Sequence, residues 1–457
     1  MPVGSLARAD VAIVGGGFAG LATARALARR GIGAVVLERE ATLGRFASGR
    51  GAGLGRQLVE DDDTTALTVR GAALLRTDFA PAWLPCGGIL SFDDPAAADA
   101  YAARAARANV PVARWSAAEV IARWPAADGA PIAAALWIPS DGVIDVPTLL
   151  ALLADGVHVE LGTAVTRIDA PRGSSSDGER SGGDDGRGDI RLATTGRERG
   201  GDGDGGRGDG ERSGDGDGER SGDGERSGDG ERGGDDGRGD GERSGGGERS
   251  GGGDGRGDIR LATTRRERGG DGDEGRGDGE RGGGGERGGV RLATTRGEVF
   301  ARVVVDASGA WAGALTDDPP LEAFKRHLFV LEAAAPEAAP YWWHLGAGEL
   351  YARAAGDGVL ASPCDGALTP AHDAAVDELG RAALRARFAP TGLAELPIAR
   401  AWACQRSFAP DRRMRLGRDP KRPWLVWAAA LGGHGATASA AVGEVVAAAV
   451  GDALRDH

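Results

Sequence analysis

Apolar runs and apolar residues at helical spacing alternate along the first forty positions of the chain. Val11–Val14 is an unbroken apolar run, which is typical of a buried parallel strand. Leucine and alanine then recur at helical spacing from Leu21 to Ala28, and Ala34–Leu37 is a second apolar run. The pattern predicts a β–α–β unit over residues 10–40.

Three glycines separate the first strand of this unit from its helix. Gly15, Gly17 and Gly20 follow the pattern G-x-G-x-x-G, which permits a tight turn, close approach of a pyrophosphate and close helix–strand packing. The free N–H groups at the start of the helix favour phosphate. Glu38, about 20 residues further on, can accept hydrogen bonds from ribose hydroxyls. We expect a dinucleotide site here; an ordinary β–α–β unit with a crowded crossing is the alternative.

Later apolar runs predict a second layer of structure. Strands are predicted at 86–92, 133–139, 157–161, 164–169, 290–295, 326–332, 341–344, 349–353, 359–362 and 424–429, and helices at 96–109, 147–154, 376–388 and 436–450.

Residues 172–289 have a different composition, because they consist mainly of Gly, Asp, Glu, Arg and Ser. So few apolar residues cannot offset the entropy lost on ordering, and we expect disorder. The stretch also repeats: DGRGDIRLATT occurs at 185–195 and 254–264, and GGVRLATT at 288–295. Only the last copy continues into an apolar strand. We infer that duplications expanded a short loop between the strands at 164–169 and 290–295.

The composition limits which classes of partner and which cellular compartment we expect for this protein. The formal net charge of −13 disfavours binding to nucleic acid or to an anionic membrane. Cys86, Cys364 and Cys404 are too few and too scattered for a disulfide framework or a metal cluster. We find no signal-like segment before the first strand and no uninterrupted apolar stretch of bilayer-spanning length. These features predict a cytoplasmic protein with no metal and no integral membrane part.

A second glycine turn precedes the C-terminal helix. Gly432, Gly433 and Gly435 permit the backbone to approach a planar ring, and the helix that begins at Ala436 directs the positive end of its dipole toward it. A reduced flavin carries negative charge that such a dipole stabilises. The turn therefore favours a flavin; a glycine-rich turn before a buried helix is the alternative.

Taken together, the motifs resemble those of the FAD-dependent amine and amino-acid oxidoreductases of the D-amino-acid oxidase superfamily, which includes D-arginine dehydrogenase, glycine oxidase and sarcosine oxidase. The resemblance is carried by GGGFAG with Glu38, ASGRGAG at 47–53, CGGILSF at 86–92, DGVIDVPTLL at 141–150, VVVDASGAWAG at 303–313, AWACQRSFAPD at 401–411 and ALGGHGATASAAVGE at 430–444.

The resemblance implies an α/β plus α+β fold: a discontinuous Rossmann-like FAD-binding domain and an antiparallel-sheet substrate domain, interrupted by the insertion. It divides the chain into FAD-binding segments 1–58, 141–171, 290–316 and 398–457, substrate segments 59–140 and 317–397, and the insertion 172–289.

The resemblance also implies roles for individual residues. Those expected to bind FAD are Gly15, Gly17, Gly20, Glu38, Arg39, Ser48, Gly49, Arg50, Val165, Ala307, Cys404, Gly433, His434, Gly435, Ala436 and Thr437. Those expected at the substrate are Arg406, which would grip a carboxylate through its planar fork, Tyr351, His434, and Arg326 or His327. A surface role for Arg406, plain packing for Tyr351 and a structural role for His434 are the alternatives.

Two departures from the pattern bear on chemistry. Gly87 and Gly88 stand where D-arginine dehydrogenases place a glutamate for the guanidinium, which disfavours a cationic substrate. Cys404 stands where sarcosine oxidase-like enzymes carry the cysteine bound to flavin; a small buried thiol is the other reading.

The implied reaction is oxidation of the C–N bond of an amino acid or N-methylamino acid, with hydride passing to the flavin and the imine then hydrolysed. Either oxygen or a quinone fits as electron acceptor. The alternatives are a flavoenzyme of the same fold that acts on a hydroxy acid or a tRNA base, and a non-catalytic protein that binds partners through the acidic repeat.

Overall fold

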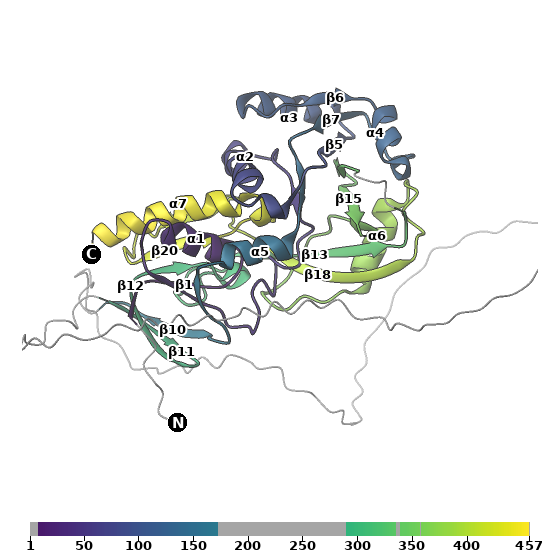
Figure 1. The fold of residues 1–457 in the computed structure, drawn as a ribbon. Helices are drawn as coiled ribbons and strands as arrows, with labels where there is room; N and C mark the ends of the chain where they lie inside the picture. The colour runs from purple at the N-terminus through teal and green to yellow at the C-terminus, as the bar shows by residue number, and fades with distance from the viewer. Residues whose placement is uncertain (1–7, 172–288, 335–338, 357, 457) are drawn as a thin grey trace, which may run out of the picture. The chain divides into compact units, whose positions relative to one another are not determined.

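The computed structural model describes residues 8–171, 289–334, 339–356 and 358–456 (Figure 1). Within these residues the strands form a first sheet of eight strands, a second of nine and a third of three. The helices are α1 (Phe18–Ala28), α2 (Asp62–Thr77), α3 (Pro95–Arg107), α4 (Ala117–Arg123), α5 (Val146–Ala154), α6 (Glu378–Phe388) and α7 (Gly435–Arg455), with single 3₁₀ turns η1 (Ala80–Ala82), η2 (Pro125–Ala127) and η3 (Gly309–Trp311).

Five parallel strands form the centre of the first sheet. Their order is β9 (His158–Glu160), β2 (Ala34–Leu37), β1 (Arg8–Val14), β12 (Gly297–Asp306) and β20 (Leu425–Ala429). The register pairs Val14 with both Leu37 and Asp306. Gly15, Glu38 and Ala307 follow these strands, so they meet at one edge of the sheet, where parallel sheets bind ligands.

The first sheet is buried on both faces, as continuous apolar strands predict. Val11 and Ile13 pack with Val442 and Val446 of α7, which lies beside α1 (Figure 1). The intervening residues of β1, Ala12 and Val14, face the other side and pack with the antiparallel strands β10 (Val165–Asp169) and β11 (Val290–Thr294). β19 (Arg415–Arg418) pairs with β20 at the edge of the sheet. By length and composition α7 could cross a membrane, but 61% of its most apolar stretch is buried here, as in a core helix.

β10 and β11 pair with each other, with Asp169 opposite Arg291. The third copy of the repeat therefore forms β11, next to β10, the strand on the other side of the loop that we inferred to have been expanded. The earlier copies, and the insertion 172–289 apart from Gly289, lie outside the described residues. Their predicted disorder stays a prediction.

The second sheet is mostly antiparallel and has two distinct faces. Its order is β17 (Ala367–Leu368), β13 (Glu322–Leu331), β16 (Gly358–Ser362), β15 (Leu350–Ala355), β14 (Tyr341–Leu345), β5 (Gly88–Phe92), β7 (Ala134–Ile138) and β6 (Ala113–Trp115), with β18 (Ile398–Phe408) on the other side of β13. One face packs against α4 and α6 through residues such as Phe329 and Trp342. The opposite face carries Leu328, Trp343, Tyr351 and Cys404. We call this opposite face the inner face.

The third sheet is small and antiparallel, and its strand order is β3 (Leu54–Gly55), β8 (Gly142–Ile144) and β4 (Trp83–Leu84). Next to it, α2 and α5 pack Leu75 and Leu149 against Phe18 of α1.

Most predicted elements are confirmed within a few residues, among them β2, β5, β7, β11, β20, α3 and α6. One assignment differs, since we placed 398–457 wholly in the FAD-binding domain. β18 pairs with β13 from Phe408 to Ile398, so this strand belongs to the second sheet. Its faces mix small, polar and charged residues, and its alternation is therefore weak in the sequence. The rest of the domain division stays a prediction.

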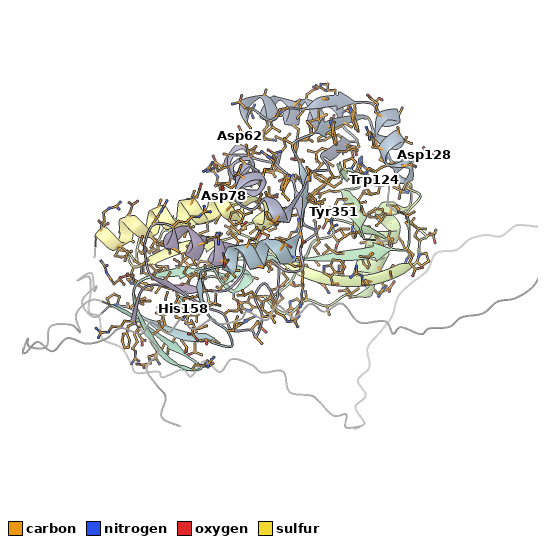
Figure 2. All side chains as sticks on the ribbon, viewed as in Figure 1. Asp62, Asp78, Trp124, Asp128, His158 and Tyr351 are labelled. Atoms are coloured by element: carbon orange, nitrogen blue, oxygen red, sulfur yellow. The ribbon has the colours of Figure 1, made fainter. Side chains whose placement is uncertain are left out.

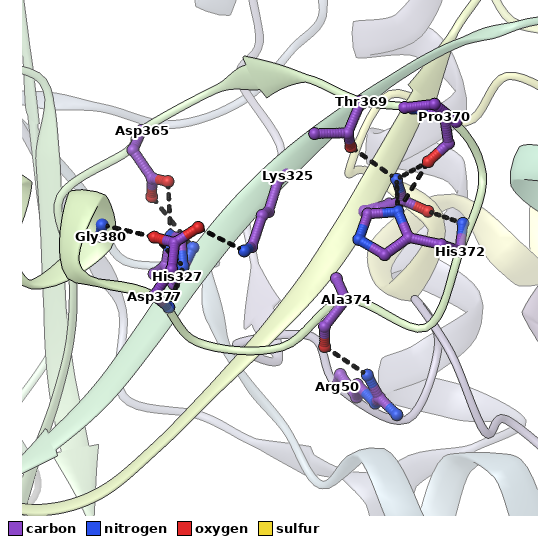
Figure 3. Close-up of polar contacts among 11 residues, drawn as sticks. Arg50, Lys325, His327, Asp365, Thr369, Pro370, His372, Ala374, Asp377 and Gly380 are labelled. Atoms are coloured by element: carbon purple, nitrogen blue, oxygen red, sulfur yellow. Dashed lines mark hydrogen bonds and ion pairs between the residues drawn. The ribbon is translucent and has the colours of Figure 1, made fainter. Parts of the chain in front are cut away.

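The segment from Cys364 to Asp377 is held to the second sheet by polar side chains (Figure 3). His327 bonds Asp365 through its backbone N and its ring Nδ1, at 2.9 and 2.7 Å. Lys325 pairs with Asp377 at 2.6 Å. His327, a candidate for the substrate site, therefore braces this segment with a side chain that is only 2% exposed.

Candidate functional site

Two helix N-termini, more than 400 residues apart in the sequence, meet at the edge of the first sheet. α1 begins after Gly17 and α7 after His434. A β-carbon built on Gly435 would lie 3.9 Å from the Phe18 ring. Since each N-terminus presents unsatisfied N–H groups and a positive dipole end, the pair favours an anionic or polar ligand.

The glycines of the first turn leave no room for side chains. Gly15 has φ +106°, and a β-carbon there would lie 2.6 Å from the Ala307 carbonyl oxygen. A β-carbon on Gly20 would overlap the Gly15 carbonyl. One on Gly17 would lie 2.9 Å from Ser48 Oγ, which accepts the Phe18 N–H at 3.0 Å. Close packing of the chain thus requires glycine at 15 and 20 and leaves little space for a side chain at 17.

Glu38 is fixed at the end of β2. Its Oε2 accepts the Gly16 N–H at 2.6 Å and its Oε1 accepts the Glu40 N–H at 2.9 Å. Burial raises the pKa of this carboxyl, and the two backbone bonds oppose the rise. Each oxygen keeps acceptor capacity, which suits ribose hydroxyls.

Arg39 lies over two aromatic rings. Its guanidinium carbon is 3.8 Å from the centre of the Trp311 ring and 4.7 Å from that of Phe46. Val165, also predicted to bind FAD, is a half-buried residue of β10 opposite Thr294. These two residues stay predicted cofactor contacts.

The small-residue loop 47–53 is held by surrounding side chains. Arg50 donates to the carbonyls of Ala374 and Ala403, at 3.1 and 3.2 Å, and pairs with Asp373 at 2.6 Å. The Arg50 carbonyl accepts the Trp402 indole N–H at 2.9 Å. Arg50 therefore ties this loop to the second sheet. Gly49 has no room for a side chain, because a β-carbon there would overlap the Gly44 carbonyl.

The second glycine turn lies directly under Arg406. Gly433 has φ +90°, and a β-carbon there would be 2.6 Å from Arg406 Cδ. In the first turn of α7, Thr437 donates to the Leu54 carbonyl at 2.9 Å, while Gly435 and Ala436 pack near Phe18 and Leu43. The structure thus brings the predicted turn and the predicted arginine together.

The inner face of the second sheet presents the other predicted substrate residues. Cys404 lies opposite Arg326 in the β13–β18 register, and Arg406 follows on the same side of β18. Tyr351 lies on β15 of this face, with its ring 4.9 Å from that of Trp343 (Figure 2). Cys404 is buried, and burial raises the pKa of its thiol.

Two cations on this face, the buried Arg326 and the half-buried Arg406, differ in what they bind. Arg326 donates to Cys364 Sγ and to the Cys364 and Asp365 carbonyls, at 3.0, 3.0 and 3.2 Å. Arg406 has a buried Nε with no hydrogen-bond partner among the described residues. Burial and the neighbouring Arg326 lower the pKa of Arg406 to about 10, so it stays cationic at neutral pH. Arg326 braces the 364–365 segment, whereas Arg406 forms no hydrogen bond or ion pair among the described residues.

Tyr351 and His434 are both uncharged at neutral pH. Burial raises the pKa of Tyr351 to about 12, so its hydroxyl remains a donor. Burial, more than the charges around it, lowers the pKa of His434 to about 4. His434 Nε2 lies 3.7 Å from Glu60 Oε2.

Arg56 and Glu60 lie beside this turn and were not predicted from the sequence. Arg56 is only 3% exposed and pairs with Glu60 at 2.6 Å. Burial raises the pKa of Glu60, but the charge of Arg56, the nearby His434 and the hydrogen bond from Arg56 together outweigh burial and lower this pKa to about 2. An isolated arginine in the apolar run Leu54–Val59 was the signal that could have identified it.

The donor set fits FAD. Two glycine turns without room for side chains, two adjacent helix N-termini and Glu38 supply the contacts that a dinucleotide requires. Gly15, Gly17, Gly20, Glu38 and Ser48 would hold the nucleotide half. The turn from Gly433 to Thr437 would border the flavin.

Comparisons with known proteins agree with this geometry. The profile of a family described as FAD dependent oxidoreductase matches residues 10–191 and 278–449, more than half of the chain, and the unmatched gap lies within the insertion. The structure is similar to that of glycine oxidase from Geobacillus kaustophilus (20% identity, TM-score 0.63, 98% of this chain and 95% of that chain). It is also similar to L-proline dehydrogenase from P. horikoshii (16%, 0.66, 96% and 92%).

A third solved structure with a similar fold is that of L-alpha-glycerophosphate oxidase from Mycoplasma pneumoniae with FAD bound (13% identity, TM-score 0.63, 98% of this chain and 95% of that chain). By sequence, the chain is 35% identical over 147 residues to the tRNA 5-methylaminomethyl-2-thiouridine biosynthesis bifunctional protein MnmC of Thiobacillus denitrificans (strain ATCC 25259 / T1). That match covers 29% of this chain and only about a quarter (24%) of the relative.

Proposed function

Because the chain belongs to the family of FAD-dependent oxidoreductases, within the D-amino-acid oxidase superfamily, we propose that it oxidises the C–N bond of an amino acid or N-methylamino acid. The observation that carries the proposal is Arg406, whose buried Nε has no hydrogen-bond partner in the described part of the chain and whose side chain rests on the Gly433 turn. A buried cation without a counter-charge is costly, and a planar guanidinium fits a carboxylate in two-point contact.

The chain's own residues position the substrate. Arg406 holds the carboxylate at the N-terminus of α7. Arg326, which forms no ion pair with a carboxylate among the residues that the structure describes, adds positive potential beside it. The Tyr351 hydroxyl, protonated at neutral pH, can donate to the same carboxylate. Bound FAD supplies the acceptor for the electron pair. The protein contributes orientation and exclusion of water around the α-carbon.

The proposed reaction requires no strongly basic side chain. The substrate binds as the free amine, and His434 is a neutral imidazole that can accept a proton but does not retain it at neutral pH. The glycines at Gly87 and Gly88 place no carboxylate for a cationic side chain. We therefore propose an amino-acid substrate whose side chain is not cationic.

The named relatives support an amino substrate, since glycine oxidase, L-proline dehydrogenase and L-amino acid deaminase from Proteus vulgaris share the fold. The MnmC similarity favours one alternative, an amine carried on a tRNA base. The net charge of −13 argues against binding a polyanion. The similar fold of the glycerophosphate oxidase favours a second alternative substrate, a hydroxy compound. Cys86, Cys364 and Cys404 are unpaired, which supports a reducing, cytoplasmic compartment.

The test is anaerobic mixing of the holoprotein with D- and L-amino acids, glycine, sarcosine, hydroxy acids and the matching amines that lack a carboxylate. Loss of the flavin's visible absorbance reports reduction. We expect reduction by one or a few carboxylate-bearing amines. Bleaching by hydroxy acids alone, or by no amine, would refute the proposal.

A variant pair tests the role of Arg406. Arg406→Met should lower the ratio of reduction rate to Kd by about 30-fold or more for the amino acid, and much less for the matching amine. Arg400→Met, an exposed arginine of the same strand, is the control and should behave as wild type. Equal losses for both substrates in Arg406→Met would contradict a carboxylate contact.

A further inference from the structure

Arg56 is the only charged side chain in the buried run Leu54–Val59, which links β3 to α2. Its Nε donates to the Leu58 carbonyl at 2.7 Å, and its Nη2 donates to Glu60 at 2.6 Å. Its guanidinium carbon lies 4.1 Å from the centre of the Trp343 ring. Two polar contacts and one stacking contact therefore fix the plane of the guanidinium.

The remaining nitrogen, Nη1, is buried and has no hydrogen-bond partner among the described residues. Buried donors of this kind are rare, because an unsatisfied donor loses its hydration without compensation. The fixed plane also prevents Arg56 from turning this nitrogen toward solvent without breaking its other contacts. An acceptor from outside the protein is the simplest partner for it.

The neighbours of Arg56 connect it to the residues that we placed at the substrate. Trp343, on which it stacks, contacts Tyr351 on the inner face. The charge of Arg56 also acts on His434 in the Gly433 turn and on Cys364, the thiol bound by Arg326. Arg56 thus lies between the N-terminus of α7 and the inner face of the second sheet, which carries Arg406.

We propose that Arg56 determines specificity: Nη1 donates a hydrogen bond to an oxygen on the substrate's side chain. The proposal rests on the proposed function, since it describes the same site. The Glu60 carboxylate compensates the charge of Arg56, so a neutral amide oxygen fits as well as a carboxylate oxygen. The enzyme therefore selects amino acids whose side chain bears a carboxamide or carboxylate over hydrocarbon side chains of equal size.

The experiment compares leucine, asparagine and aspartate, which have side chains of similar shape, in anaerobic reduction of the holoprotein. The enantiomer that reduces the flavin is used for all three. We expect asparagine, aspartate or both to exceed leucine at least about tenfold in the ratio of reduction rate to Kd, because leucine leaves the buried donor unpaired. The two oxygen-bearing substrates separate amide from carboxylate recognition.

Arg56→Lys keeps the charge but removes the planar fork. It should bring the ratio between the oxygen-bearing substrates and leucine close to one. Arg76→Lys is the matched control, because Arg76 is an exposed arginine over Trp83, and it should leave the ratio unchanged.

The wild-type comparison stands even if Arg56→Lys fails to fold. Equal reduction by leucine, asparagine and aspartate overturns the role of Arg56 and leaves the proposed function intact. A preference that persists in folded Arg56→Lys also overturns it. Reduction by no amine overturns the proposed function, and this inference with it.

Discussion

Asp141 gives the stability of the fold a measurable dependence on pH. The carboxylate is 1% exposed, accepts hydrogen bonds from the Gln57 N–H and side-chain amide at 3.2 and 2.8 Å, and accepts the Tyr341 hydroxyl. Burial outweighs these bonds and raises the pKa from 3.8 to about 6. The folded state therefore binds the Asp141 proton more tightly than the unfolded state does.

The sign and size of the effect follow from linkage. A raised carboxyl pKa contributes stability that is present below pH 3.8 and is lost as the pH rises through about 6. A shift of about two pH units corresponds to about 3 kcal/mol. In Asp141→Asn this contribution is absent. The difference in unfolding free energy, wild type minus variant, should fall by about 2.4 kcal/mol between pH 4 and pH 7, because the unfolded carboxyl is already more than half ionised at pH 4.

Urea unfolding of the holoprotein at constant excess FAD, from pH 4 to pH 7.5, measures this difference. Asp128→Asn removes an exposed carboxylate and should give a flat difference (Figure 2). Tyr341→Phe removes a donor that lowers the Asp141 pKa, so it should move the loss of stability to higher pH. A wild-type minus Asp141→Asn difference that is constant with pH, or that rises with pH, would refute the reasoning.

Four further predictions concern the cofactor site and the insertion. Gly20→Ala should weaken FAD binding by about 2 kcal/mol or more, measured by flavin titration, because its β-carbon would overlap the Gly15 carbonyl; Gly348→Ala, with open space around it, should not. Because the pKa of His434 is about 4, this residue should cause no inflection in the pH profile of kcat/KM between pH 6 and 8. An inflection in that range that is present in the wild type and absent in His434→Gln would contradict this prediction. Deleting residues 172–288 leaves four residues between Asp169 and Arg291, enough for a hairpin loop, so flavin content should be retained; loss of soluble protein would count against this. The raised pKa of Cys404 keeps its thiol protonated and a poor nucleophile, so denaturation and filtration should release all of the flavin, and retained yellow protein would show attachment.

The sequence by itself determined the elements whose signals are local. Val11–Val14, the glycines at 15, 17 and 20, and the run Ala34–Leu37 specify strand, turn and helix through residues that are neighbours in the chain, and β1, α1 and β2 form there. The repeat also located β11, since only the copy at 288–295 continues into an apolar strand.

Only the tertiary structure decided which distant residues share a site. Arg406 rests on Gly433 because β18 pairs with β13 in the second sheet, and that pairing depends on register rather than on a local pattern. Arg326 and His327 were equal candidates in the sequence. The fold turns both to the 364–377 segment, and leaves Arg406 with a nitrogen that has no partner in the described ranges of the chain. Arg56 became visible only when burial was known, because the energetic cost of an unsatisfied donor depends on what surrounds it in space.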